Sequence, residues 1–425
     1  MKRSPAEHVV QFLSFSGNGV DSIKALSYLN TKKWGHILQW MDNAGLAFYF
    51  LEKVKNTNAA ELIPEWVLSR LQRSYEANRE RLDYMACRFD LINRKFNDAG
   101  IRYVVVKGFS LVPQYCPDAS LRHQGDFDYL IDGPLLPAAQ QLLIELGYHA
   151  KPPSSDQEFI FVTPNKAIPT RSHEQYFIQA PHAVELHLDI WDSGQHRLPP
   201  MQPQFSVDRA MPHHWGALTF PALTEEDAFL LQVLHACQHL LTYWIRMSSL
   251  YEIGSFLNQR AQDASLWNRL EQRIGDNLML RDFFVLISEL VSDLFDVPIP
   301  SLARIWERQL RPTTRIWIED YARTCAFCEA PAYKFHSLPP AKLVLFLLNQ
   351  YKNANTQRHV VRNRLIAPKR FSRMASSIKE KPALIWNVDW WKCQRLVQRS
   401  VFHALSGLRY LCEVPRWWWR TRSSA

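Results

Sequence analysis

The chain has 425 residues, 47% of them hydrophobic, which is enough to bury one large core or two or three smaller ones. A net charge of +9 and a pI near 9.1 favour anionic partners such as nucleotides, nucleic acid or acidic lipid. No stretch of about 18 uninterrupted apolar residues occurs and the first residues lack a signal-peptide pattern, so we expect a cytoplasmic protein rather than a membrane-spanning or secreted one.

The cysteines form an odd and scattered set. They are Cys87, Cys116, Cys237, Cys325, Cys328, Cys393 and Cys412. Such a set in a long chain predicts reduced thiols and no disulfide framework. The C-x-x-C spacing of Cys325 and Cys328 permits a zinc or redox site, but no second pair at zinc-ribbon spacing accompanies it, so we favour ordinary half-buried thiols.

Residues 1–100 are predicted to form an N-terminal helical region. Apolar residues recur at helical spacing over residues 34–54 and again over residues 63–96. These patterns are typical of amphipathic packing helices and carry no recognisable chemistry. The second helix is expected to end at Gly100, just before the first strand.

Residues 101–220 are predicted to form an α/β core that begins with a strand and a turn. The apolar run over residues 101–106 ends at Lys107 and Gly108, after which Ser110 is placed to cap a short helix. The free N–H groups of a helix N-terminus, with a lysine beside them, form an anion site suited to phosphate.

Two aspartates follow on the next predicted strand. Asp126 and Asp128 are two residues apart, so their side chains point to the same face of the strand. Paired carboxylates repel each other unless a cation lies between them. Together with the phosphate site one short connection earlier, the pair describes a site for a metal-bound nucleoside triphosphate.

The core continues with a helix over residues 135–146, and with strands over residues 159–162 and 175–178. Residues 184–190 then alternate strictly between polar and apolar, which places Glu185, His187 and Asp189 on one face. That face can supply a third metal-binding carboxylate, from Glu185 or from Asp189. A solvated face of an edge strand is the other interpretation of the same pattern.

Residues 191–223 are predicted to be a loop, and a helix then begins at Thr224. His235, His239 and Arg246 lie close to one stripe of this helix. The spacing of the histidines can bind zinc, but position 236 is alanine where a zinc protease needs glutamate, which disfavours zinc hydrolysis. The histidines either satisfy interior hydrogen bonds or contact a nucleotide or acceptor.

Residues 221–357 are predicted to form a helical domain, and residues 358–425 a basic, tryptophan-rich tail with 15 Lys/Arg against 3 Asp/Glu. Trp386, Trp390 and Trp391 fall on one side of a helix, and residues 416–420 place three tryptophans between two arginines. Either the tail docks on a membrane or an anionic partner, or its rings cover the helical domain while its cations stay solvated.

The segment from Lys107 to Ile131 resembles the signature of an uncharacterised bacterial nucleotidyltransferase family of the DNA-polymerase-β-like superfamily. The resemblance rests on Lys107-Gly108, Arg122 and the run from Gly125 to Ile131. In this family Lys-Gly stands where most of the superfamily has Gly-Ser. The third acid directly precedes Leu-His, which selects Glu185, and residues 234–253 look like a second family stretch, a helix beside the active site.

The resemblance implies an α+β fold, with a small mixed-sheet nucleotidyltransferase core flanked by N-terminal and C-terminal helical regions. It implies an enzyme that moves an NMP from a Mg-bound NTP such as ATP to an acceptor hydroxyl or phosphate by metal-assisted in-line displacement. A small molecule, peptide or protein acceptor is favoured over RNA. The alternative is a non-catalytic nucleotide-binding or partner-binding protein that keeps the fold.

The resemblance also assigns residues to this site. Mg2+ or Mn2+ would be held by the three catalytic acids Asp126, Asp128 and Glu185. The nucleotide would be bound by Lys107, Gly108, Ser110 and Arg122. Residues expected around them are His187, Asp189, His239 and Arg246.

Overall fold

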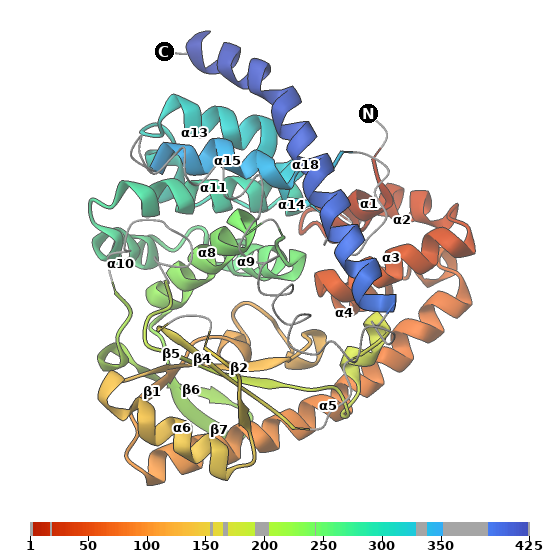
Figure 1. Cartoon of the computed structure of the whole chain (residues 1–425). Helices are drawn as coiled ribbons and strands as arrows, with labels where there is room; N and C mark the ends of the chain where they lie inside the picture. Colours follow the sequence, from red (N-terminus) through yellow and green to blue (C-terminus); the bar gives the residue numbers. More distant parts are fainter. Residues whose placement is uncertain are drawn as a thin grey trace, which may run out of the picture. The chain divides into compact units, whose positions relative to one another are not determined.

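The computed structural model describes residues 3–17, 19–153, 156–164, 169–191, 204–242, 244–328, 338–351 and 390–423. Figure 1 shows the chain coloured along its sequence, and the contacts within it divide it into two compact units. Unit 1 comprises Met1–Ala236 and Arg246–Trp306, and unit 2 comprises Cys237–Ile245 and Glu307–Ala425. The division into four regions along the sequence remains a prediction. Within the described residues, no helix has the length and apolar character needed to cross a membrane.

Unit 1 contains most of the helices. They are α1 (Pro5–Phe12), α2 (Val20–Ser27), α3 (Thr31–Ala44), α4 (Ala47–Asn56), α5 (Glu65–Asp98), α6 (Leu136–Glu145), α8 (Glu225–Leu241, whose last turn belongs to unit 2), α9 (Met247–Arg260), α10 (Ala264–Ile274), α11 (Leu278–Phe295) and α12 (Ser301–Glu307). The helical pattern over residues 34–54 is split between α3 and α4. Gly45 breaks it with a φ of 73°, and a Cβ on Gly45 would lie 2.5 Å from Ser248 Oγ.

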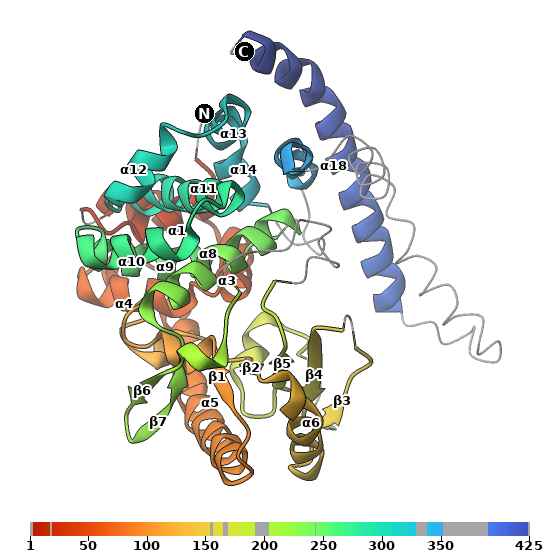
Figure 2. The same ribbon diagram turned by 90° about the vertical axis from the view of Figure 1, so that its left-hand side faces the viewer.

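A seven-stranded mixed sheet forms the centre of unit 1. Its strands are β1 (Tyr103–Val105), β2 (Asp126–Ile131), β3 (His149–Ala150), β4 (Glu158–Val162), β5 (Ala183–His187), β6 (Met211–Trp215) and β7 (Leu218–Ala222). Figure 2 shows them side by side in the order β3-β4-β5-β2-β1-β7-β6. β2 is parallel to β5 and antiparallel to β1. The expected α+β fold with a mixed sheet is confirmed.

Two predictions for this region are wrong. Residues 175–178 form no strand, because Tyr176 ends a 3₁₀ helix (Ser172–Tyr176) and donates to the buried carboxylate of Asp42 at 3.1 Å. The predicted loop over residues 191–223 contains the β6–β7 hairpin, whose turn includes Gly216 at a φ of 57°. A long-range contact with Asp42 decides the structure at Tyr176, and a short turn at Gly216 decides it in the hairpin. The local sequence pattern is weak in both segments.

The two faces of the sheet are covered differently (Figure 1). Helices α5 and α6 pack against one face, where Phe89 and Leu143 meet Phe127, Tyr129 and other strand residues in a continuous core. Leu231 of α8 packs with Val104 and Leu130 on the opposite face. This second face also carries the polar side chains of the candidate site.

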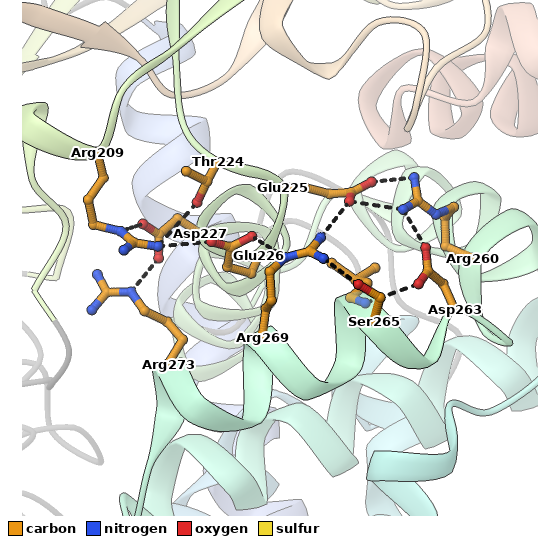
Figure 3. A network of polar contacts seen from close by, with 11 residues as sticks. Arg209, Thr224, Glu225, Glu226, Asp227, Arg260, Asp263, Ser265, Arg269 and Arg273 are labelled. Carbon is orange, nitrogen blue, oxygen red and sulfur yellow. Dashed lines mark hydrogen bonds and ion pairs between the residues drawn. The ribbon is translucent and has the colours of Figure 1, made fainter.

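Ion pairs surround the N-terminus of α8 (Figure 3). Asp227 is fully buried and accepts hydrogen bonds from Arg209 Nε at 2.7 Å and from Arg273 Nε at 2.5 Å. Glu226 pairs with Arg269 of α10 at 3.3 Å. The network joins α8 to α10 and to the segment before β6, so it holds in place a helix that covers the site face of the sheet.

We expect Asp227→Asn to lower the free energy of unfolding by about 3 kcal/mol, because two guanidinium groups lose their shared carboxylate. Denaturant unfolding measures this change. Asp276→Asn is the matched control, since it removes the acid of an exposed ion pair with Arg281 and should leave the free energy of unfolding unchanged. Equal losses in the two variants would contradict a special role for the network.

Unit 2 is helical in the residues described. Its helices include α13 (Pro312–Trp317), α14 (Arg323–Ala326), α15 (Val344–Leu348) and α18 (Trp390–Ser423). Cys325 and Cys328 are buried free thiols there, and among the described residues neither belongs to a group of three metal-ligating side chains. Trp386 lies outside the described residues, as do the side chains of Trp390 and Trp391.

Candidate active site

The candidate site lies on two neighbouring strands in the middle of the sheet. The parallel register of β2 and β5 sets Asp128 directly beside Glu185. Because side chains alternate along a strand, Phe127 and Val184 turn into the core and the two acids share the opposite face. Burial of Phe127 and Val184 on one face therefore turns the acids to the other.

Four polar side chains meet on this face. Ligand atoms of Asp128, Glu185 and His187 lie within 4.8 Å of one another, a spacing that suits a metal ion. His187 Nε2 is 3.4 Å from Asp128 Oδ1 and 3.8 Å from Glu185 Oε2. Lys107 Nζ donates to Asp128 Oδ1 at 2.9 Å. Asp128 thus lies between an ammonium group and an imidazole.

Asp126 is not a member of this close group. It pairs in register with Ala183 rather than with Glu185, and two residues along a strand correspond to about 6.6 Å. Its charge still acts on the group, because it raises the pKa of both Lys107 and Glu185. The structure therefore places Asp126 at the margin of the cluster and His187 inside it.

The pKa values of the three buried acids, Asp126, Asp128 and Glu185, are shifted from their ordinary values. Burial and the charges of Asp128 and Asp126 raise the pKa of Glu185 to about 9. Burial and the charge of Asp128 also raise the pKa of Asp126. Burial acts in the same direction on Asp128, but Lys107 and His187 outweigh it and lower the pKa of Asp128. The positive charge of Lys107 therefore outweighs burial at Asp128 but not at Asp126 or Glu185.

The turn after β1 is built around Gly108. Its φ is 68°, and a Cβ there would lie 2.5 Å from Gln124 Nε2. Gln124 in turn donates to the backbone carbonyl of Asp126, so the turn packs directly against the start of β2. The expected helix is only a four-residue 3₁₀ helix (Gly108–Leu111), and Ser110 is part of it: its Oγ donates to the carbonyl of Lys107 at 3.2 Å. The helix is short because the chain returns to an extended conformation at Val112, and Lys107 rather than Ser110 is its N-cap residue, with no capping hydrogen bond from a side chain.

Arg122 belongs to a buried chain of polar contacts beside β2. Its Nε donates to Glu252 Oε1 at 3.1 Å, and its Nη1 donates to Gln124 Oε1 at 3.1 Å. Tyr49 of α4 also donates to Glu252 Oε1, at 3.0 Å. Burial opposes the charged form of Arg122, but Glu252 outweighs it and raises the pKa of Arg122. Helices α4 and α9 therefore orient this guanidinium.

Arg246 has a different place from the one expected. Helix α8 ends at Leu241, so Arg246 does not share its stripe and instead precedes α9 as the N-cap residue. Burial and the charge of Arg122 lower the pKa of Arg246. Its Nε is buried without a hydrogen-bond partner among the residues described. Two guanidinium groups therefore act on the same region as Asp126, whose pKa both lower.

Comparison with known protein families identifies the family of this chain. A family model described as an uncharacterised nucleotidyltransferase matches residues 30–296, which is more than half of the chain. The chain belongs to this nucleotidyltransferase family. The match covers the turn after β1, β2, β5 and α9, and it confirms the resemblance seen in the sequence. None of the curated proteins matched the chain.

Arg81 of α5 holds the start of both acid-bearing strands in this member of the family. Its fully buried guanidinium donates to the carbonyls of Gln124, Phe177, Ala180 and Pro181. Burial lowers the pKa of Arg81 to about 10. One side chain thus holds the segments that lead into β2 and β5, and with them the relative position of the acids.

Asp189 and His239 were also expected around the site. Asp189 follows the end of β5, and its Oδ1 accepts a hydrogen bond from the backbone N–H of Trp191 at 3.2 Å. His239 belongs to unit 2, where its ring meets Trp244 edge-on. Among the described residues, neither belongs to the metal-sized group.

Two acids near the site, Glu158 and Glu252, were not predicted from the sequence. Glu158 Oε1 on β4 lies 4.0 Å from His187 Nδ1, and Glu252 is buried beside Arg122. Glu158 begins a strand whose next residues on the same face are Ile160 and Val162, so no polar pattern indicated it. Glu252 lies within the second family stretch, which is the signal that could have indicated it.

The donor set of the site fits a hard divalent cation. Carboxylate oxygens are the ligands that Mg2+ prefers, and Mn2+ also accepts an imidazole. Burial and then the charge of Asp128 raise the pKa of Glu185 and of Asp126, so a cation beside these carboxylates would favour their charged forms. Asp128, Glu185 and His187 could hold one ion. Asp126 lies two residues from Asp128 along β2.

Proposed function

We propose that this protein is an enzyme that transfers an NMP from an NTP to the hydroxyl or phosphate of an acceptor. The observation that carries the proposal is the placement of Asp128 beside Glu185 in a member of a nucleotidyltransferase family. The attacking oxygen forms a bond to the α-phosphorus, the bond to the bridging oxygen breaks, and pyrophosphate leaves.

Each residue of the site has a role in this proposal. Asp126, Asp128 and Glu185 would hold Mg2+ or Mn2+, which when bound lowers the pKa of the attacking hydroxyl and stabilises the leaving pyrophosphate. Glu185 would accept the proton of the hydroxyl, because its carboxylate lies on the site face beside Asp128. Lys107 exchanges its contact with Asp128 for the phosphate oxygens.

The guanidinium groups complete the anion site. Arg122 and Arg246 both act electrostatically on Asp126, and Arg246 Nε has no hydrogen-bond partner among the residues described. A guanidinium group that is held in place by its neighbours stabilises phosphate charge without further reorganisation. We therefore assign the two arginines to the phosphates of the NTP or to a phosphate acceptor.

The test is transfer of label from each α-labelled NTP, with Mg2+ or Mn2+, to the components of a cell extract. Fractions that contain small molecules, peptides, proteins or RNA are assayed separately, and we expect the label outside the RNA fraction. Label released only as NMP or retained as NTP in every fraction would contradict the proposal.

A second candidate is a nucleotide-binding protein without catalysis. The contact between Lys107 and Asp128 favours it, because the lysine neutralises a carboxylate that the reaction would need for a cation. Saturable NTP binding that does not require a divalent cation, with no labelled product, would support this candidate over the enzyme.

We expect Lys107→Ala to weaken NTP binding at least tenfold in the presence of Mg2+, because an ammonium group at the end of β1 no longer meets the phosphates. Calorimetric titration measures the dissociation constant. Lys151→Ala, at an exposed lysine of the same sheet region, is the matched control and should bind as wild type. Equal affinity in Lys107→Ala and wild type would remove Lys107 from the nucleotide site.

A further inference from the structure

Helix α18 packs one of its faces within unit 2. Tyr410 and Trp417 both stack on Phe346, with ring centroids 4.6 Å and 4.9 Å apart. Arg420 Nη1 donates to Asp320 Oδ1 at 2.9 Å. Tyr410, Trp417 and Arg420 lie on one side of the helix, so their contacts fix the rotation of the helix about its own axis.

The opposite face of α18 carries an exposed apolar stripe. The stripe consists of Val397, Val401, Leu408, Leu411, Trp418 and Trp419, which are between 46% and 66% exposed. At 3.6 residues per turn these positions fall in a sector that runs from about 80° to about 180° around the helix from Tyr410. The positions between them on this side are Ser400, Ala404, Gly407 and Pro415. The stripe is therefore uncharged along about 33 Å of helix.

The positive charge of the tail indicates which kind of surface covers this stripe. Residues 358–425 contain 15 Lys/Arg against 3 Asp/Glu, so a second copy of the chain would bring a tail of the same sign against it. An anionic surface has the opposite charge. At the end of the stripe Arg422 lies over the ring of Trp418 at 3.7 Å, and tryptophan with arginine is typical of the boundary between lipid and water.

We propose that the apolar stripe of α18 docks unit 2 onto a lipid surface with anionic headgroups. The helix lies along the surface, since its packed face is held by unit 2 and only the stripe can enter the lipid. Arg422, at the end of the stripe, then meets the headgroups while the stripe meets the outer part of the acyl layer. The proposal concerns unit 2 and does not depend on nucleotide transfer at the β2–β5 site.

The test is co-sedimentation of the full-length protein with vesicles of phosphatidylcholine alone or with phosphatidylglycerol added. We expect binding to the anionic vesicles only, and at least a tenfold loss of partitioning in Leu408→Asp with Leu411→Asp. Tyr28→Asp with Leu278→Asp is the matched control, because it also introduces two aspartates, at large exposed residues of unit 1 that are 88% and 70% exposed. The control should bind as wild type.

Three results would overturn the proposal. They are absence of binding to anionic vesicles, equal binding of the stripe variant and the wild type, and a wild-type dimer in light scattering that the stripe variant abolishes and vesicles do not displace. If the stripe variant fails to fold, quenching of tryptophan fluorescence by brominated lipid replaces it. Quenching should then be lost in Trp418→Tyr with Trp419→Tyr, and unchanged quenching there would count equally against the stripe.

Discussion

The double variant Asp126→Asn with Asp128→Asn should lose nucleotide transfer by at least about a thousandfold, because charge stabilisation of this kind contributes that much to a reaction rate. The amide oxygen at position 128 can still accept the hydrogen bond from Lys107, so the fold should persist. The variant removes two negative charges and leaves the shapes of the side chains almost unchanged. Loss of transfer would therefore report loss of the cation site.

Initial rates with α-labelled NTP measure this effect, and circular dichroism checks the fold. Asp132→Asn is the matched control, since Asp132 directly follows β2 and pairs with Arg102 instead of facing the site. It should transfer as the wild type does. Transfer at the wild-type rate in the double variant would exclude both aspartates from the mechanism.

Glu185→Gln should abolish transfer and at the same time stabilise the protein at pH 8 when no divalent cation is added. The pKa of Glu185 is about 9 in the folded protein and about 4.5 in the unfolded chain. Between these values the folded state keeps a proton that the unfolded state has lost, so wild-type stability falls as pH rises. Glutamine removes this fall, and we expect its melting temperature at pH 8 to be higher by about 2 °C or more.

Thermal melts from pH 5 to pH 9 measure this prediction. The two melting curves should diverge as pH rises, and Mg2+ should raise the melting temperature of the wild type more than that of the variant. Glu145→Gln, at an exposed position of α6, should follow the wild type at every pH. Parallel pH profiles for Glu185→Gln and wild type would show that Glu185 is ionised without a cation.

The strands that carry the acids could be predicted because their neighbours are buried. Phe127 and Tyr129 alternate with Asp126 and Asp128, and this alternation is visible in the sequence alone. The same is true of Glu185 between Val184 and Leu186. Helix α5 was predictable for a related reason, since its apolar residues keep a regular helical spacing over 34 residues.

The rest of the site depends on contacts between residues far apart in the chain. Lys107 pairs with Asp128 and Arg122 with Glu252, and no local pattern indicates either pair. Arg246 was misplaced because helical spacing continues past the point at which α8 ends. The inclusion of His187 in the cluster follows from the register of β2 against β5, which a single sequence leaves undetermined.

The position of β5 between β4 and β2 governs when the site can appear during synthesis. A nascent chain that ends before residue 183 has made Asp126 and Asp128 but has no strand to place beside them. Its β2 would expose an edge of unpaired backbone N–H and C=O groups, which invites pairing with other chains. The last strand of the sheet ends at Ala222, so a fragment meant to express the core should extend at least that far.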